Sequence, residues 1–250
     1  MSNDSLGDRM KGYEDLHRIK LMKRVPVVIR IDGKAFHTFL KDAEKPFDKV
    51  VTSAMIEAAR AVLDEIGGTA RFAYVQSDEC SIAINNALDL NTAAWFDNNL
   101  QKMVSVASSV FTNVFNEHYE NKVTMKKATF DARAFALPDL NELVNYYVWR
   151  QQDTTRNSIR MYASTMFSHK ELEGVSNEKV QEMMFQKDGF NWNNSPTWTK
   201  RGVVAIKDAM DLEIPIFTQD REYLKELYLP KDDTERVVAE ELQEPRGPTH

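Results

Sequence analysis

Two strand-like stretches, each ending in carboxylates, constrain the fold of this chain more than any other feature. In the first, the β-branched run Val27–Ile31 leads directly to Asp32. In the second, an alternating apolar run breaks at Gln-Ser-Asp-Glu (76–79) and then resumes, a pattern typical of a tight hairpin between two strands. Asp32 is therefore expected at the end of a strand, and Asp78 and Glu79 at the tip of a hairpin. If the strands are neighbours, three carboxylates meet at one edge of a sheet.

Three such carboxylates predict a metal site. Carboxylates at close range repel one another, and a hard divalent cation is the natural group to neutralise them. We interpret Asp32, Asp78 and Glu79 as the catalytic residues of a site for two Mg²⁺ ions, which would stabilise the attacking and leaving oxygens of an in-line displacement. Asp32, Asp78 and the backbone carbonyl of Gly33 are the predicted ligands, and Glu79 is expected to ligate weakly or to orient water. The alternative that spacing alone leaves open is that these acids cap turns at strand ends.

Helical periodicity on either side of the hairpin predicts how the strands are connected. Apolar residues recur at helical spacing over 5–22, 48–66 and about 92–116, and further strand runs follow at 70–76, 80–85 and 128–136. From the first strand onward the order is strand, helix, strand, strand, helix, strand, or βαββαβ. This order is typical of the ferredoxin-like and polymerase-palm antiparallel sheet, so we predict an α+β fold.

Beyond Pro138 the pattern becomes mainly helical. Helices are predicted over 139–152, 154–168 and 176–186, followed by a short strand over 202–206. We therefore expect a palm-like catalytic domain over 1–137, a helical C-terminal part over 138–230 that packs on it, and a flexible tail over 231–250.

The sequence argues against a membrane-spanning or disulfide-bonded secreted protein. No stretch approaches the roughly 20 apolar residues that a membrane-spanning helix needs. The N-terminus lacks the charged-then-apolar pattern of a signal peptide, and Cys80 is the only cysteine. We expect a cytoplasmic protein with no membrane partner. The formal net charge of −6 provides no overall basic field, so any contact with nucleic acid depends on local basic groups.

Six short motifs, in order along the chain to about residue 207, resemble the tRNA-His guanylyltransferase superfamily. They are Arg-Ile-Asp-Gly-Lys-Ala-Phe-His (30–37), Lys-Pro-Phe-Asp (45–48), Tyr-Val-Gln-Ser-Asp-Glu (74–79), Phe-Asp-Ala-Arg (130–133), Trp-Arg-Gln-Gln-Asp (149–153) and Phe-Asn-Trp-Asn-Asn through Lys-Arg-Gly (190–202). Val75 and Ala132 stand where the family has glycine. The segment 155–159 lacks the motif that the eukaryotic branch ties to tRNA-His, so the chain resembles the guanylyltransferase-like, 3′–5′ RNA polymerase branch.

The resemblance implies an activity and a set of partners. Members of this family are Mg²⁺-dependent nucleotidyltransferases that add nucleotides to the 5′ end of tRNA by 3′–5′ polymerisation, as 5′-end repair or G−1 addition. Activation of the 5′-monophosphate by ATP or GTP gives a 5′–5′ pyrophosphate-linked intermediate, which the 3′-hydroxyl of an incoming nucleoside triphosphate attacks. The expected ligands are two Mg²⁺ ions, ATP and/or GTP, nucleoside triphosphates and tRNA. The family also implies a homotetramer, arranged as a dimer of dimers.

The same motifs assign residues to nucleotide and to RNA. The backbone N–H groups from Gly33 to His37 would cradle a triphosphate, with Lys34 and His37 adding charge. The predicted nucleotide-binding residues are Asp32, Gly33, Lys34, Ala35, Phe36, His37, Lys45, Ser77 and Asp78. The predicted RNA-binding residues are Arg133, Arg150, Asp153, Arg156, Asn157, Lys187, Asn191, Lys200 and Arg201. Asp48 belongs to the second motif, but it could equally well serve only as the N-cap of the helix that follows.

Two other functions share some of these features. A palm-type nucleotide cyclase would use the same carboxylates on a nucleoside triphosphate alone, without RNA. A non-catalytic RNA-binding module would use the same sheet, although clustered carboxylates do not suit an RNA-binding face. The choice of RNA, the need for a template, the preferred nucleotide and the choice between ATP and GTP for activation are open at this point.

Overall fold

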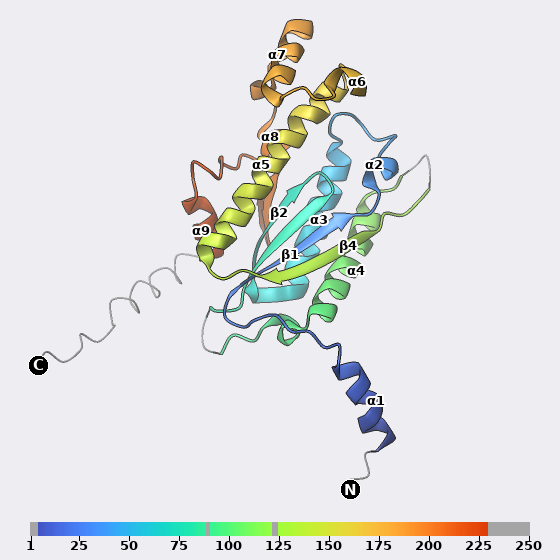
Figure 1. Ribbon diagram of the computed structural model, residues 1–250, viewed down its shortest axis with the longest axis vertical. Helices are drawn as coiled ribbons and strands as arrows, with labels where there is room; N and C mark the ends of the chain where they lie inside the picture. The colour runs from blue at the N-terminus through green and yellow to red at the C-terminus, as the bar shows by residue number, and fades with distance from the viewer. Residues whose placement is uncertain (1–4, 89–90, 122–124, 230–250) are drawn as a thin grey trace, which may run out of the picture.

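One antiparallel sheet organises the molecule. The computed structural model describes residues 5–88, 91–121 and 125–229, and the strands among them form a six-stranded sheet (Figure 1). The strands are β1 (Pro26–Gly33), β2 (Ala70–Gln76), β3 (Glu79–Asn85), β4 (Phe130–Ala136), β5 (Val203–Ile206) and β6 (Ala209–Asp211). They lie in the order β4-β1-β3-β2-β5-β6, and neighbouring strands are antiparallel.

The first four strands and two long helices form the predicted βαββαβ unit. The helix α3 (Lys49–Ile66) lies between β1 and the β2–β3 hairpin, and α4 (Leu100–His118) lies between that hairpin and β4. Within this unit β1 and β3 occupy the middle of the sheet, with β4 and β2 on either side. The predicted α+β fold with a ferredoxin-like antiparallel sheet is therefore confirmed.

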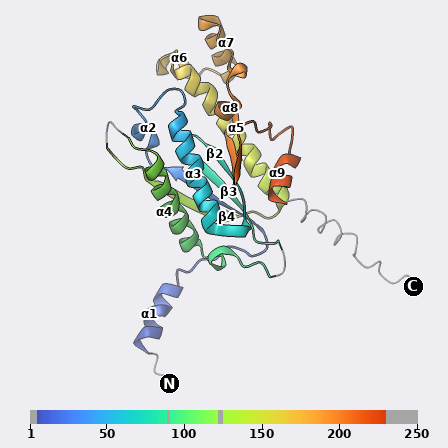
Figure 2. The ribbon, with the colours of Figure 1, turned by 180° about the vertical axis from the view of Figure 1, so that it is seen from behind.

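The helices α3 and α4 cover one face of the sheet, and this face is turned to the viewer in Figure 2. Their apolar residues and those of the strands form the larger hydrophobic core, which includes Ile29, Ile31, Met55, Val62, Ile82, Met103 and Phe111, all fully buried. Side chains alternate between the two faces of a strand. Because Ile29 and Ile31 point into this core, Arg30 and Asp32 point to the opposite face.

The helix α5 (Leu140–Ser164) crosses that opposite face, which is turned to the viewer in Figure 1. Its Tyr147 packs against Phe72 of β2, with 4.7 Å between ring centroids, and the short helix α9 (Glu222–Tyr228) contributes Leu224 to the same smaller core. The charged residues of β1, β3 and β4 on this face therefore lie beneath or beside α5.

The structure corrects the prediction of two helices over 139–152 and 154–168, because α5 is continuous through both. No glycine or proline interrupts residues 140–164. The Asp153 carboxylate accepts hydrogen bonds from Arg150 and Arg156 of the same helix, at 3.1 Å each, instead of capping a new helix.

The C-terminal part adds strands to the sheet as well as helices. After α5 come α6 (His169–Leu172), α7 (Asn177–Asp188) and α8 (Thr197–Arg201), and then β5 pairs with β2 and β6 with β5. The sheet therefore contains strands from both sides of the boundary expected at 137/138. The tail predicted over 231–250 lies outside the described residues.

The helices predicted over 5–22 and 92–116 are both shorter in the structure. The helix α1 (Leu6–Asp15) projects from the body of the molecule and has no buried residue. The second helix is α4, which starts only at Leu100, because Phe96 and Asp97 have positive φ angles of 50° and 51° in the turn that precedes it. None of the helices in the described part of the chain has the length and apolar character needed to cross a membrane.

Candidate functional site

The ends of β1 and β3 bring the predicted carboxylates together. Asp32 lies directly opposite Glu79 in the β1–β3 ladder and opposite Asp131 in the β1–β4 ladder. The Gly33 N–H donates to the Asp78 carbonyl oxygen at 3.0 Å, which ties the end of β1 to the hairpin tip. Residues paired across an antiparallel ladder share a face, so Asp32 and Glu79 both point toward α5.

Asp78 lies in the two-residue turn of the β2–β3 hairpin. Ser77, the other turn residue, has a positive φ of 48°. Burial raises the pKa of the Asp78 carboxyl, and the nearby charges of Asp32 and Glu79 raise it further, while hydrogen bonds from its own backbone and from Ser77 oppose this shift. Asp32 and Asp78 line the same cavity, of about 430 Å³. The two predicted metal ligands, far apart in the sequence, therefore meet in space.

Glu79 also lines this cavity, but its carboxylate is bound by Arg150 of α5. Its Oε1 accepts from Nε of Arg150 and its Oε2 accepts from Nη2, both at 2.7 Å, and Arg150 is only 6% exposed. Among the described residues, no three His, Cys, Asp or Glu side chains form a group that could hold a metal ion. All three carboxylates thus line the first cavity, but Glu79 is engaged in an ion pair with Arg150, which leaves Asp32 and Asp78 as the candidate metal ligands.

The rest of the first cavity is lined by an aromatic wall and by polar groups of α5. Phe47 packs edge-on against Trp198, with 5.9 Å between ring centroids, and both line the cavity. Asp153 and Asn157 of α5 line it as well. The cavity therefore joins carboxylates to an aromatic surface of the kind that accepts a nucleobase.

A second cavity, of about 370 Å³, also borders the hairpin tip. It is lined by His37, Lys45, Ser77 and Asp78, and it shares Ser77 and Asp78 with the first cavity. Met161 of α5 lines both cavities. Asp78 therefore borders a cavity that contains Lys45 and His37 as well as the cavity that contains the aromatic wall.

The predicted phosphate cradle is smaller in the structure than the sequence suggested. The N–H groups of Gly33 and Lys34 donate to the carbonyl oxygens of Asp78 and Thr129, at 3.0 and 2.9 Å. The following residues open the short helix α2 (Phe36–Phe39), where the first N–H groups have no acceptor within the helix. The N–H groups of Ala35, Phe36 and His37 remain as the candidate cradle.

Phe36 has a structural role in addition to its place in that cradle. Its side chain is 3% exposed and packs against Phe130, with 4.8 Å between ring centroids. A Cβ atom on Gly33 would lie 2.2 Å from the Phe36 ring, so only glycine fits at this position. The aromatic packing beneath β1 therefore fixes the loop that carries His37.

The predicted RNA-binding residues do not form one surface. Asp153 and Asn157 line the first cavity, where Asp153 also pairs with the exposed Arg156. Arg150 is buried against Glu79. Lys200 is 9% exposed, donates to the Asn193 carbonyl oxygen at 2.5 Å, and has its pKa lowered by burial.

The remaining predicted RNA-binding residues lie elsewhere. Lys187 donates to the Met166 carbonyl oxygen and lies over the Phe167 ring, 4.6 Å from its centroid. The Asn191 side chain accepts the N–H of Asn193 and so caps a local turn. The carbonyl oxygen of Arg201 accepts from the Tyr74 hydroxyl at 2.6 Å. These contacts give the residues local structural roles.

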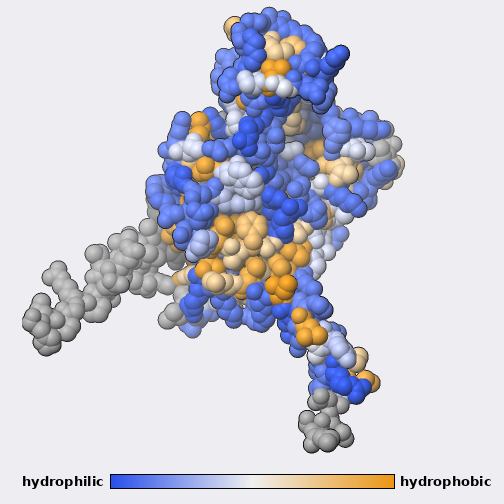
Figure 3. Space-filling view, in the orientation of Figure 1, coloured by the Kyte–Doolittle hydropathy of each residue, from blue (hydrophilic) through white to orange (hydrophobic). Residues whose placement is uncertain are grey.

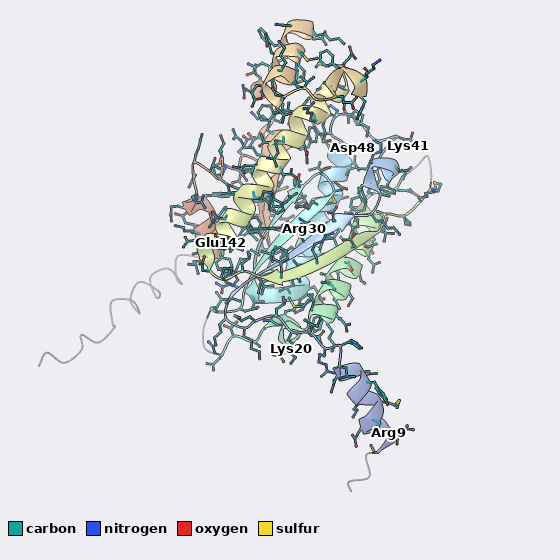
Figure 4. The ribbon with its side chains drawn as sticks, viewed as in Figure 1. Arg9, Lys20, Arg30, Lys41, Asp48 and Glu142 are labelled. Atoms are coloured by element: carbon teal, nitrogen blue, oxygen red, sulfur yellow. The ribbon has the colours of Figure 1, made fainter. Side chains whose placement is uncertain are left out.

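Arg133 is exposed on β4 and lies directly opposite Arg30 of β1. The Nε atom of Arg30 is buried and has no hydrogen-bond partner among the described residues. Figure 4 labels Arg30 on the sheet, beside α5. Sequence reasoning quoted Arg30 in a motif but gave it no role, and its position two residues before Asp32 was the available signal, since alternate residues share a face.

Comparisons with known proteins point to one family. Residues 7–138 match the family described as Thg1, tRNAHis guanylyltransferase. The tRNA(His) guanylyltransferase of Schizosaccharomyces pombe is 33% identical over 222 residues, which are 82% of this chain and 81% of that protein. The solved structure of a bacterial Thg1-like protein in complex with ATP is 44% identical, with a TM-score of 0.85 over 90% of this chain and 99% of that one. A bacterial Thg1-like protein in complex with GTP is 41% identical, with a TM-score of 0.76 and the same coverage.

Proposed function

Because the chain belongs to the tRNA(His) guanylyltransferase family and is a nucleotidyltransferase, we propose that it adds nucleotides to the 5′ end of tRNA by Mg²⁺-dependent 3′–5′ polymerisation. The 5′-monophosphate of the RNA attacks the α-phosphate of ATP or GTP, which releases pyrophosphate and leaves a 5′–5′ pyrophosphate linkage. The 3′-hydroxyl of an incoming nucleoside triphosphate then attacks the RNA 5′-phosphate and expels the activating group as AMP or GMP. The observation that carries the proposal is the meeting of Asp32 and Asp78 in one cavity beside an aromatic wall.

The two aspartates fit Mg²⁺ better than a cation that needs a complete set of protein ligands. Mg²⁺ is usually held by one or two carboxylates together with substrate phosphates. Asp32, Asp78 and the backbone carbonyl of Gly33 offer such a partial set, in keeping with the lack of a three-residue cluster among the described residues. Bound there, Mg²⁺ would polarise the phosphoryl oxygens and lower the pKa of the attacking hydroxyl.

The side chains around the carboxylates bind and orient the nucleotide. We place the triphosphate in the second cavity, where Lys45 supplies positive charge and His37 can donate a hydrogen bond, beside Ser77. The base then lies against Phe47 and Trp198 in the first cavity. This placement puts the triphosphate next to Asp78, where the reaction takes place, and puts the base farther from it.

The 5′ end of the RNA approaches over β1 and β4. Arg30 and Arg133 face each other directly across the ladder, and like charges in that position repel. An RNA phosphate between them would remove the repulsion and give the Arg30 Nε an acceptor. Arg30 lies two residues before Asp32, on the same face of β1. A phosphate held by Arg30 therefore lies next to the carboxylates.

The nucleotides and the RNA are proposed from the relatives and from the sequence together. Bacterial Thg1-like proteins have been solved in complex with ATP and with GTP, and we propose both as ligands of this chain. The curated relatives are named for tRNA(His). Since residues 155–159 lack the motif associated with that tRNA, we propose tRNAs with incomplete 5′ ends as the broader substrate class.

We also propose that the chain forms a homotetramer. The large apolar side chains of α1 and the residues after it are exposed: Leu6, Met10, Tyr13, Leu16, Ile19 and Met22. Figure 3 shows a further apolar patch over the part of the sheet that α5 leaves open, near the end of α1 that joins the body of the molecule. Both surfaces are of the kind that an interface between copies covers.

The experiment offers 5′-labelled truncated tRNAs to the protein with Mg²⁺ and each nucleoside triphosphate in turn, with and without an opposing template base. Extension of the labelled strand at its 5′ end, with an activated intermediate visible when only ATP is present, supports the proposal. No extension of any truncated or full-length tRNA would contradict it. A parallel incubation with GTP and Mg²⁺ but no RNA tests the cyclase alternative, which predicts a cyclic nucleotide.

A further inference from the structure

The pairing of β1 with β3 creates an electrostatic conflict beside the carboxylate pair. Asp32 and Glu79 lie directly opposite each other and point to the same face. Like charges in that position destabilise a sheet. Asp78 precedes Glu79 in the chain and lies close enough to both acids to feel their charges. An uncompensated Glu79 would therefore be a third anion at a site that needs two.

Arg150 resolves this conflict with a buried, bidentate ion pair. The side chains of Arg150 and Glu79 are 7% and 9% exposed, and both hydrogen bonds between them are 2.7 Å long. The guanidinium lies 4.5 Å from the centroid of the Trp149 ring and also donates to Asp153 at 3.1 Å. Such a planar fork fixes the orientation of a carboxylate in a way that a lysine does not.

The other contacts of Glu79 also draw it toward α5. Ser81 Oγ lies 3.5 Å from Glu79 Oε1, and the same hydroxyl is 2.8 Å from the Tyr146 hydroxyl of α5. Glu79 is thus bound on the side of the helix. Asp32 and Asp78 lie close enough for the charge of one to act on the other.

We propose that Arg150 is a positioning residue, which ties up the Glu79 carboxylate so that, of the three acids, only Asp32 and Asp78 bind the cation. The inference rests on the proposed function, because it concerns the same metal site. It replaces two roles expected from the sequence: Glu79 is not a metal ligand, and Arg150 acts through Glu79 instead of binding RNA. The pair keeps the charge beside the cation neutral while fixing the hairpin tip against α5.

This arrangement predicts opposite effects when either partner is replaced. In Glu79→Gln the unpaired guanidinium repels the cation, so the dissociation constant for Mn²⁺, used as a stand-in for Mg²⁺, rises by about tenfold, as for other residues that orient metal ligands. In Arg150→Gln the freed carboxylate joins the anions, so Mn²⁺ binds more tightly while kcat for nucleotide addition falls. General loss of structure would weaken Mn²⁺ binding in both variants.

The double variant Glu79→Gln with Arg150→Gln separates the inference from its alternatives. It removes both charges and keeps two side chains that hydrogen-bond, so its Mn²⁺ dissociation constant is expected to return to within a few-fold of the unmodified protein. Mn²⁺ binding is measured by electron paramagnetic resonance without nucleotide, and folding by circular dichroism. The control is Glu57→Gln with Arg60→Gln, an ion pair on α3 whose loss leaves Mn²⁺ binding unchanged.

The outcomes that contradict the inference are distinct from failure of the proposed function. A double variant as defective as Glu79→Gln in Mn²⁺ binding makes Glu79 a ligand and overturns it. Equal weakening in both single variants reduces the pair to a structural tie and also overturns it. If Arg150→Gln does not fold, Arg150→Lys takes its place, and normal Mn²⁺ affinity with a lowered kcat is then the supporting result. An unmodified protein that binds no Mn²⁺ would reject the metal-dependent function itself.

Discussion

At the scale of single residues, Asp78 meets opposing demands from folding and from chemistry. Burial, and then the charges of Asp32 and Glu79, raise the pKa of its carboxyl in the folded protein. A raised pKa means that this group favours folding most when it is protonated. Its stabilising effect is complete below the unfolded-state pKa and is lost as the pH rises through the folded-state pKa. In its ionised form, the Asp78 carboxylate serves the site at the expense of stability.

Replacing Asp78 with asparagine should therefore separate activity from stability. Nucleotide addition by Asp78→Asn is expected to fall by roughly a hundredfold to a thousandfold, the loss typical when one electrostatic stabiliser is removed. The midpoint of thermal unfolding at pH 7, without Mg²⁺, should stay the same or rise. Asp64→Asn, at an exposed acid of α3, is the control and should change neither quantity. A large fall in the unfolding midpoint of Asp78→Asn would show that the carboxylate supports the fold.

The pH dependence of stability follows from the same shift. As the pH falls through the raised pKa of Asp78, its carboxyl takes up a proton and the difference in unfolding free energy between Asp78→Asn and the unmodified protein should shrink. Urea denaturation without Mg²⁺ at a series of pH values measures that difference. A difference that grows toward low pH would mean that the pKa of Asp78 is lowered by folding, which contradicts the burial argument.

Gly33 is a second residue whose identity the packing dictates. In Gly33→Ala the new Cβ would meet the Phe36 ring at 2.2 Å, and that ring is already enclosed by Phe115 and Phe130. The expected cost is about 1–3 kcal/mol of unfolding free energy, as for other overpacked positions, measured by urea denaturation. Gly12→Ala is the control, because nothing lies within 4 Å of its added Cβ and alanine favours a helix. Equal stability of the two variants would contradict the argument.

At the scale of elements, α3 shows how one motif residue can be explained by local structure. The Asp48 carboxylate accepts from the N–H groups of Glu44, Val50 and Val51, so it fixes both the loop before α3 and the first turn of the helix. The same loop carries Lys45, which lines the second cavity. Capping therefore also positions a cation of the site.

Asp48→Ala is expected to lower the unfolding free energy by about 1 kcal/mol, the usual loss for an N-cap. Asp48→Asn retains an acceptor and should lose less. Because the cap holds the loop of Lys45, the KM for ATP should rise in Asp48→Ala more than kcat falls. Unfolding in urea and steady-state kinetics measure these effects. A collapse of kcat with normal stability would assign Asp48 to the chemistry.

The helix α5 is the element that joins most parts of the site. Along one face it carries Arg150, which binds Glu79, then Thr154, whose hydroxyl is 2.8 Å from that of Tyr74, and then Met161, which lines both cavities. These residues recur at intervals close to whole helical turns. A break near 153, as the sequence suggested, would have removed this alignment.

At the scale of the whole molecule, α1 requires an explanation that one copy of the chain does not give. No residue of α1 is buried, and its large apolar side chains Leu6, Met10 and Tyr13 are exposed. The segment that follows α1 is tied to the body, because Lys20 and Lys23 both pair with Asp97. An exposed helix that presents apolar side chains next to this anchor is consistent with the proposed assembly of four copies.

The proposed tetramer predicts that a charge on α1 breaks the assembly. Tyr13→Glu together with Leu16→Glu should give smaller species in analytical ultracentrifugation, while circular dichroism remains that of a folded protein. Glu14→Gln, on the polar side of α1, is the control and should sediment as the unmodified protein does. If the double variant sediments normally, α1 is not part of the interface.

By itself, the sequence determined the order of the elements and the position of the two aspartates. Alternating and helical periodicities report local geometry, so the βαββαβ unit followed from them, and strand ends placed Asp32 and Asp78 where acids gather. The sequence also showed the family through ordered motifs. Its errors, such as the break in α5 and the start of α4, lie where side-chain pairs or strained turns override local preference.

Only the tertiary structure decided which of the three acids is engaged in an ion pair. Glu79 and Asp78 are neighbours in sequence, but the partner that captures Glu79 is Arg150, from a helix 71 positions further along the chain. The same holds for the joining of β5 to β2 and for the facing pair Arg30 and Arg133. Contacts of this kind depend on which faces meet in three dimensions, and periodicity along the chain carries no information about the partner on the other side.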